Sequence, residues 1–278
     1  MSFYPQPNKY QCGPFALKYA LVMLGQFRDE KIIARRSGSS WWYGTDEIGL
    51  AKAARSFDCT MKYFKDSTPE AAIKKLISFL EKGTPCILSV DSWGHWVTAL
   101  NYDKKKFIVV DSAKEKVIMT YSAKQLLKRW HYFDETEEFE SYDAYALIPN
   151  FKTVSKANLT LERAKTVMQE RNADLAQHWD KYFNDLITIC RPVRPNARHT
   201  MSLNEFLRRY ETLIVKQVAN WHGEPSYYEL SKVLDNMKFV AETYDLHIYE
   251  KDEKKALIDL ASILMMYACG KHGMKEIY

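Results

Sequence analysis

The sequence contains no segment that resembles a membrane span or a secretion signal. No uncharged apolar run approaches the roughly 18 residues that a transmembrane helix needs. The first ten residues, MSFYPQPNKY, hold no basic segment followed by an apolar one, which is the arrangement of a signal peptide. We therefore expect a cytoplasmic protein without a membrane span.

Cofactor and metal motifs are also missing. The chain has no GxGxxG, Walker A, GxSxG or HExxH sequence, and its seven histidines show no partner at metal-ligand spacing. Cysteine is scarce, odd in number and never arranged as CxxC, which favours reduced thiols over a disulfide framework or a structural zinc site. The five cysteines are Cys12, Cys59, Cys86, Cys190 and Cys269. We predict no metal and no cofactor.

A strong excess of one charge is absent as well. Forty Lys and Arg residues stand against 35 Asp and Glu residues, which gives a net charge of +5, and the densest basic run is the three lysines 104–106. Such a short run is more typical of a solvated turn than of a nucleic-acid site, so we expect no nucleic acid as a partner. Because 46% of the residues are apolar, the chain can bury a large core.

The pattern of apolar residues changes near residue 150. Residues 1–150 alternate between helical and strand-like segments, which predicts an α+β domain. Residues 151–278 show helical periodicity without comparable strands, with helices expected over about 160–190, 202–221, 226–244 and 252–270. This half predicts an all-α helical bundle, which would cap a cleft, recognise a substrate or partner protein, or pair with a second copy of the chain.

One cysteine lies where a helix is expected to begin. Cys12-Gly13-Pro14 opens a segment whose apolar residues recur at spacings of three and four, which predicts a helix from Cys12 to about Leu24. The positive end of the helix dipole favours the thiolate form of a cysteine at this position. Pro14 fits a first helical turn, where its missing N–H costs nothing. A lone cysteine is more commonly a small buried apolar residue, so its role as a nucleophile depends on partners elsewhere.

Two polar residues border a predicted hairpin. His95 lies in the strand-like segment 94–102, and Asp111 ends the segment 107–111, with a turn expected over 103–106. The two positions differ by an even number, so a three-residue loop would place their side chains opposite each other on one face, while other registers stay open. Asp111 would then supply the orienting hydrogen bond that a catalytic histidine needs.

Further candidates flank these positions. Gln6 precedes Cys12 by six residues, and its amide can donate a hydrogen bond. Together with the backbone N–H of Cys12, it would form an oxyanion hole for a tetrahedral intermediate. A packed aromatic loop is the alternative to a binding role for the run of aromatic residues before Gly44. The residues expected to bind substrate are Trp41, Trp42, Tyr43 and Gly94.

The order of these features is that of papain-like cysteine peptidases: a glutamine, a Cys-Gly-Pro that opens a helix, a strand histidine and a strand-end aspartate. More closely, the chain resembles the bacteriocin-processing peptidases that cleave double-glycine leaders, and their stand-alone relatives. The resemblance covers residues 1–150 and implies an N-terminal helix packed on an antiparallel sheet. The segments that carry it are QPNKYQCGPFAL (6–17), GTDEIGLAKAARSFDCTMKYF (44–64), HWVTA (95–99) and VVDSA (109–113).

The resemblance also implies a role for each candidate residue. Cys12 would be the nucleophile, His95 the general base and acid, Asp111 the residue that orients His95, and Gln6 a donor to the oxyanion. We therefore predict a cysteine peptidase that cleaves a peptide or protein through an acyl-enzyme.

The chain departs from the family at three points. Ser112 follows the aspartate where the family often has proline, and Asp58 stands where glycine is frequent. The familiar leader peptidases are fused to membrane-spanning transport segments, and this sequence carries a helical half instead. Two alternatives therefore stay open: an acyl or amide transferase or glutamine deamidase with the same residues, and a non-catalytic protein-binding module.

Overall fold

The computed structural model describes residues 3–153, 156–169, 173–190 and 197–274. The chain folds into two compact units, residues 1–178 and 179–278, and the division falls within helix α7 (Ala173–Cys190). The assignment of residues 1–150 to a peptidase domain and of 151–278 to a helical domain stays a prediction. No helix in the described ranges combines the length and the apolar character that crossing a bilayer demands.

The first unit is built around an antiparallel sheet. The strands are β1 (Cys59–Asp66), β2 (Cys86–Val90), β3 (His95–Asp103), β4 (Lys106–Val110), β5 (Ile118–Tyr121), β6 (Tyr132–Asp134) and β7 (Phe139–Pro149). Their order is β1–β7–β2–β3–β4–β5, with β6 paired to β7, and every pair is antiparallel. The α+β class predicted for this part of the chain is confirmed.

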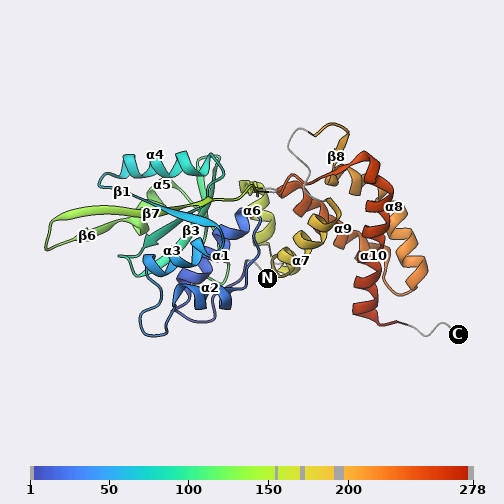
Figure 1. The fold of residues 1–278 in the computed structure, drawn as a ribbon, viewed down its shortest axis with the longest axis horizontal. Helices are drawn as coiled ribbons and strands as arrows, with labels where there is room; N and C mark the ends of the chain where they lie inside the picture. Colours follow the sequence, from blue (N-terminus) through green and yellow to red (C-terminus); the bar gives the residue numbers. More distant parts are fainter. Residues whose placement is uncertain (1–2, 154–155, 170–172, 191–196, 275–278) are drawn as a thin grey trace. The chain divides into compact units, whose positions relative to one another are not determined.

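Helices cover both faces of the sheet (Figure 1). They are α1 (Cys12–Met23), α2 (Glu30–Ser37), α3 (Glu47–Arg55), α4 (Pro69–Leu80) and α5 (Ala123–Trp130). On one face, α1 and α3 pack Leu17 and Leu50 against Ile87 of the sheet. On the other face, α4 and α5 bury Leu76 and Trp130. The sheet is therefore sandwiched between two helical layers, and each layer has its own apolar core.

Helix α1 is buried along its whole length. All twelve of its residues are buried, including Lys18, which forms an ion pair with Glu30. This explains why apolar residues are not confined to a single stripe of the helix. The helix begins at Cys12 as predicted, and Gly25 follows its end with a left-handed φ of 77°. At its start the backbone is closely packed, because a Cβ atom on Gly13 would lie 3.0 Å from the Cβ of Thr45.

The hairpin that joins β3 to β4 is tighter than the expected three-residue loop. Asp103 pairs with Lys106, so the turn consists of Lys104 and Lys105, whose φ values are 48° and 61°. Two positive φ values are typical of a type I′ turn, which matches the twist of the strands. Further along, the register shifts by one residue at Leu100, which is a β-bulge and changes which residues lie opposite each other.

The second unit consists mainly of helices. They are the end of α7, α8 (Leu203–His222), α9 (Tyr227–Thr243) and α10 (Glu253–His272), with a short antiparallel pair formed by β8 (Thr200–Ser202) and β9 (His247–Tyr249). The helices predicted over 202–221, 226–244 and 252–270 are found within two residues at each end. The one expected over 160–190 corresponds to α6 (Leu161–Met168) and α7, and residues 170–172 lie outside the described residues.

Candidate active site

Cys12 is the first residue of α1, and it is 7% exposed. Burial raises the pKa of its thiol, but a hydrogen bond with the His95 side chain, a bond from the backbone N–H of Trp96 and the positive charge of His95 outweigh burial, so the net shift of the pKa is downward. Cys59 and Cys86 are buried in the same unit, and burial raises the pKa of both thiols, to about 11 for Cys59. Of these three thiols, Cys12 is the one whose surroundings favour the thiolate.

His95 is the first residue of β3, and its ring connects Cys12 to Asp111. Its Nε2 lies 2.7 Å from Oδ1 of Asp111, which leaves Nδ1 for the thiol. Burial lowers the pKa of His95, but the hydrogen bonds with Asp111 and Cys12 outweigh burial and raise this pKa to about 9. The pKa of the thiol is shifted downward and that of the imidazole upward. Both shifts favour the thiolate–imidazolium form of the pair.

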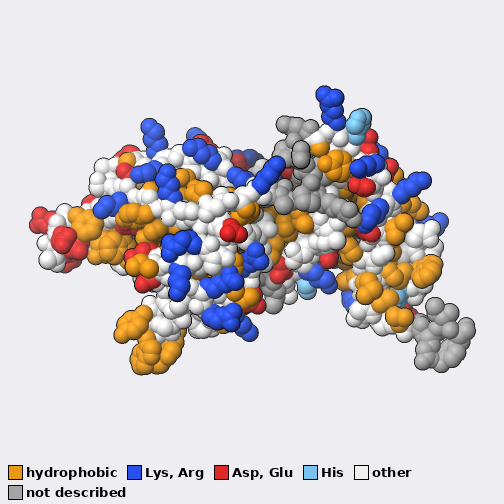
Figure 2. Space-filling model, viewed as in Figure 1, with side chains coloured by type: hydrophobic (Ala, Val, Ile, Leu, Met, Phe, Trp, Pro, Cys, Tyr) orange, Lys and Arg blue, Asp and Glu red, His pale blue; other side chains and the backbone are white. Residues whose placement is uncertain are grey.

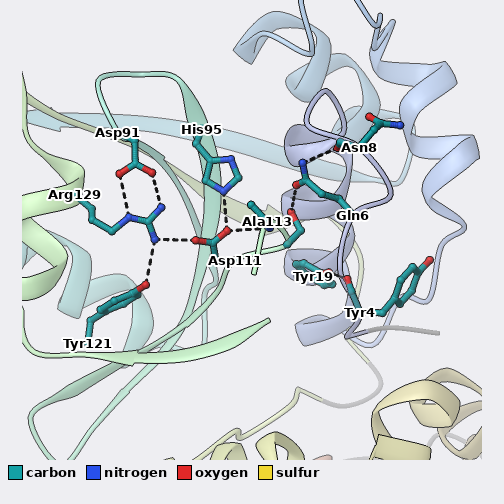
Figure 3. Close-up of polar contacts among 11 residues, drawn as sticks. Tyr4, Gln6, Asn8, Tyr19, Asp91, His95, Asp111, Ala113, Tyr121 and Arg129 are labelled. Atoms are coloured by element: carbon teal, nitrogen blue, oxygen red, sulfur yellow. Dashed lines mark hydrogen bonds and ion pairs between the residues drawn. The ribbon is translucent and has the colours of Figure 1, made fainter. Parts of the chain in front are cut away.

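Asp111 is fully buried and lies between two cationic groups (Figure 3). Its Oδ1 accepts from His95 and also from the N–H of Ala113, at 3.0 Å, and its Oδ2 accepts from Nη1 of Arg129, at 2.8 Å. Burial raises the pKa of this carboxyl, but His95 and Arg129 outweigh burial and hold it at about 2. The group is therefore a carboxylate at neutral pH, with both oxygens committed.

The register of β3 and β4 makes His95 and Asp111 diagonal neighbours. Thr98 pairs with Val110, so a continued ladder would set Asp111 across from Val97, two residues from His95. Diagonal neighbours lie on the same face and are within reach of long side chains. The predicted proximity of the two side chains is therefore present, although the pairing is not the direct one that a three-residue loop would give.

Arg129, on α5, was not among the residues predicted for the site. Its guanidinium contacts both carboxylate oxygens of Asp91 and one of Asp111, and its backbone carbonyl accepts from the N–H of Asp91 at 2.7 Å. A signal for it exists in the sequence, because Leu126 and Trp130, three residues before it and one after, form the buried face of this helix. An arginine on that face requires a buried anionic partner.

The loop before His95 has an unfavourable backbone conformation. Three successive residues, Asp91–Trp93, have φ values of 53°, 56° and 62°, in the left-handed region that costs energy for residues with a Cβ atom. The contacts of Asp91 with Arg129 hold this loop in place. Gly94 closes it by donating to the carbonyl of Asp91 at 3.1 Å. Arg129 thus connects the loop that carries His95 to the carboxylate that orients its ring.

Gln6 is oriented by two hydrogen bonds at its side-chain amide. Its Nε2 donates to the carbonyl of Asn8 at 2.7 Å, and its Oε1 accepts from the hydroxyl of Ser112 at 2.5 Å. A carbonyl only accepts, so the nitrogen must face Asn8, and one amide hydrogen is left for another acceptor. The role of Gln6 in an oxyanion hole stays a prediction. The sequence marks Ser112 only as a departure from the related peptidases, and its hydrogen bond with Gln6 is a contact that sequence reasoning missed.

A cavity of about 420 Å³ is lined by residues from the segment before α3 and from the strands of the sheet. Its walls include Thr45, which packs on Gly13, and Trp96, which follows His95 in the chain and donates from its Nε1 to the carbonyl of Thr45 at 2.9 Å. The candidate substrate cleft is therefore bounded by the segment before α3 on one side and by the strands of the sheet on the other.

The three consecutive aromatic residues differ in their relation to this cavity. Tyr43 is among its lining residues, whereas Trp41 and Trp42 are not. Trp41 and Trp42 stack on each other with ring centroids 3.5 Å apart and are 58% and 69% exposed. In Figure 2, hydrophobic side chains gather at the end of the loop that joins α2 and α3. The predicted binding role of all three residues stays a prediction.

Comparison with known proteins gives matches among solved structures alone. No family model matches the chain, and no curated protein matches it. A double-glycine-motif protease from an AMS/PCAT transporter, solved in complex with the leader peptide, is 18% identical with a TM-score of 0.40, covering 53% of this chain and 90% of that one. The peptidase domain of Streptococcus ComA is 15% identical with a TM-score of 0.40, covering 53% and 98%.

A third similar structure is described as a putative C39-like peptidase from Bacillus anthracis. It is 13% identical with a TM-score of 0.39, covering 54% of this chain and 95% of that one. Each of these three matches covers about half of this chain.

Proposed function

We propose that the protein is a cysteine peptidase that hydrolyses a peptide or protein substrate with Cys12, His95 and Asp111. The observation that carries this proposal is the 2.7 Å contact between Nε2 of His95 and the buried carboxylate of Asp111, together with the effect of His95 on the Cys12 thiol, whose pKa it lowers. The pKa of the imidazole is in turn raised to about 9. A nucleophile, a base and an orienting group in this order are what acyl transfer to a thiol requires.

The reaction follows from the protonation states of the pair. The Cys12 thiolate attacks the carbonyl carbon of the peptide bond and forms a tetrahedral intermediate. The imidazolium of His95 then gives its Nδ1 proton to the departing amine, which leaves a thioester and a neutral ring. A water molecule attacks the thioester while His95 accepts its proton, which releases the acid and restores the thiolate–imidazolium pair.

Asp111 and Gln6 support these steps without forming bonds to carbon. Because Asp111 accepts from Nε2 of His95, it keeps Nδ1 directed at the thiol and stabilises the imidazolium. The intermediate carries its negative charge on oxygen, and the backbone N–H of Cys12 with the second amide hydrogen of Gln6 would donate to that oxygen.

The test is the alkylation of each cysteine by iodoacetamide between pH 5 and pH 10, followed by mass spectrometry. Because the thiolate is the reactive form, Cys12 should react at a pH below the ordinary cysteine pKa of about 8.5, whereas Cys86 and Cys190, whose pKa values are raised by burial, serve as internal controls. His95→Ala should abolish the advantage of Cys12 near neutral pH. A Cys12 that reacts no faster in the wild type than in this variant would contradict the proposal.

Hydrolysis is measured on a peptide library in parallel, with Cys12→Ala as the matched inactive variant. Product masses with and without an added primary amine separate the proposed hydrolysis from acyl transfer, and a mass increase of one unit on a glutamine peptide would indicate deamidation. Cleavage that persists in Cys12→Ala would exclude this thiol as the nucleophile.

A further inference from the structure

The cavity that adjoins the start of α1 is lined by carboxylates and aromatic rings. Its acidic residues are Asp46 and Glu47, at the start of α3, and Asp143, on β7. No Lys, Arg or His is among the described residues that line it. The chain as a whole carries a net charge of +5, so the negative sign of this cavity is local and opposite to the overall charge.

Asp143 contributes a buried carboxylate that has no ion-pair partner among the residues that the structure describes. It is 7% exposed, and its oxygens accept hydrogen bonds from the hydroxyls of Tyr63 and Ser141 and from the indole of Trp93. Lys65 pairs with Asp143 across β1 and β7, but within the described ranges Asp143 forms no ion pair within 4 Å. A buried charge held by neutral donors alone keeps its attraction for an incoming cation.

Aromatic rings form the rest of the wall. Tyr145 lies between Tyr63 and Trp96, with ring centroids 5.1 Å and 5.8 Å away, and Trp93 stacks on Tyr132 at 3.7 Å. Ring faces attract guanidinium and ammonium groups, most strongly where water is excluded. They also give the aliphatic part of a long side chain an apolar surface.

Thr45 adds an unused polar group to the same wall. It is 9% exposed, and its hydroxyl has no hydrogen-bond partner among the residues that the structure describes. A buried hydroxyl without a partner costs free energy that a ligand can recover. Thr45 packs on Gly13, the residue that follows Cys12, so this wall of the cavity adjoins the start of α1.

We propose that this cavity binds a basic side chain, arginine or lysine, of the peptide substrate at a position adjacent to the cleaved bond. This inference rests on the proposed function, because it makes the cavity a subsite of the peptidase. A basic side chain would place its charge near Asp143 and Glu47 and its stem against the rings of Tyr145 and Trp96. An acidic side chain would be repelled, and a neutral one would leave the carboxylates without a counter-charge.

The experiment measures binding to the full-length Cys12→Ala variant, so the outcome does not depend on a reactive thiol. The probes are blocked alanine hexapeptides that carry one arginine, citrulline, leucine or glutamate at each position in turn. Citrulline is the neutral counterpart of arginine. Binding is followed by NMR through the indole N–H signals of Trp93 and Trp96, which are assigned with single Trp→Phe variants.

We expect the arginine peptide to bind roughly tenfold more tightly than the citrulline peptide at one position and at low salt, with a smaller ratio at high salt. Asp143→Asn and Glu47→Gln should each reduce this ratio. Glu47 is exposed, so its variant tests the proposal even if Asp143→Asn does not fold. Glu70→Gln is the matched control, because Glu70 is also exposed in the first turn of a helix but lies on α4.

Equal binding of arginine and citrulline at every position, or tightest binding of leucine or glutamate, would overturn the subsite. An unreactive Cys12 in the alkylation assay would instead overturn the proposed function, and it would leave the binding result intact. The two failures are therefore distinguishable.

Discussion

Two aspartates are buried in the described part of the first unit, and their partners differ: Asp111 directly follows β4, and Asp143 lies on β7. Asp111 is fully buried, with one oxygen 2.7 Å from the imidazole of His95 and the other 2.8 Å from the guanidinium of Arg129. Asp143 is 7% exposed and accepts from neutral groups alone within the described chain, which are the side chains of Tyr63, Trp93 and Ser141.

This difference gives the two carboxylates different roles: Asp111 would orient the His95 ring, whereas Asp143 would attract a cationic group of the substrate. The charge of Asp111 is balanced inside the protein by Arg129 and by the protonated His95, so little of it acts on a substrate. The charge of Asp143 is stabilised by hydrogen bonds and has no ion-pair partner among the described residues, and Asp143 lines the cavity. Similar burial therefore leads to different roles, and the variants below test that distinction.

Asp111→Asn should have the largest effect. The amide keeps the shape of the carboxylate but loses its charge, so the pKa of His95 should fall from about 9 and the ring should lose its fixed tautomer. We expect peptide hydrolysis to decrease on the order of a thousandfold. The alkaline decline of kcat/KM, expected near pH 9 in the wild type because the imidazolium is lost there, should move to lower pH. An unchanged pH profile would show that Asp111 does not control His95.

Arg129→Met should lower the free energy of unfolding by about 3 kcal/mol, because it leaves Asp111 and Asp91 without their shared cation. Urea unfolding measures this change. The matched control is Lys104→Met at the exposed ion pair with Glu162, where no measurable loss is expected.

Arg129→Lys tests whether Arg129 positions Asp111 and His95 for catalysis or only stabilises the fold. A lysine keeps the charge but cannot contact both carboxylates with a planar fork. Arg129→Lys should therefore retain part of the stability that Arg129→Met loses, whereas we expect both variants to lower kcat and to move the alkaline decline of kcat/KM to lower pH. If Arg129→Lys recovers kcat to the same extent as it recovers stability, Arg129 has a structural role only.

Local patterns explain why much of the fold and the three central residues were predictable. The start of α1 at Cys12 follows from apolar spacing, and the β3–β4 hairpin from two apolar runs around charged turn residues. His95 and Asp111 stand out because each is polar at the edge of an apolar strand. In each case the signal lies within about ten residues, which is the range over which helix and hairpin preferences act.

The contacts that sequence reasoning missed all join distant segments. Arg129 meets Asp91 from 38 positions away, and Asp143 meets Tyr63 from 80 positions away. The shift at Leu100 depends on how the strands pack and not on a local motif. Such tertiary pairings have no periodicity to reveal them, so the arginine that holds the site and the carboxylate of the cavity become visible only in the folded chain.

Lowering the pH should reduce the free energy of unfolding that Asp111 contributes, by less than Arg129→Met does. The folded-state pKa of Asp111, about 2, is below the ordinary value of about 3.9, so its contribution to stability is complete above the ordinary value and is lost as the pH falls toward 2. By linkage this amounts to about 2 kcal/mol. The difference in unfolding free energy between the wild type and Asp111→Asn should therefore narrow between pH 5 and pH 2.5. A difference that stays constant over this range would contradict the depressed pKa.

Asp143→Asn should have the smallest effect on stability, because its partners are neutral donors and no cation is left unpaired. We expect the free energy of unfolding, measured in urea, to fall by about 1 kcal/mol or less, and the alkylation of Cys12 to stay unchanged.

Tyr63→Phe removes one of these hydrogen-bond donors but keeps the aromatic ring of residue 63 and the charge of Asp143. The preference of the cavity for the arginine peptide over the citrulline peptide should therefore remain. If Asp143→Asn destabilises the protein as much as Arg129→Met does, the two carboxylates have the same structural role. If it slows Cys12 alkylation, Asp143 belongs to the catalytic network, and the proposed difference in role between Asp111 and Asp143 is wrong.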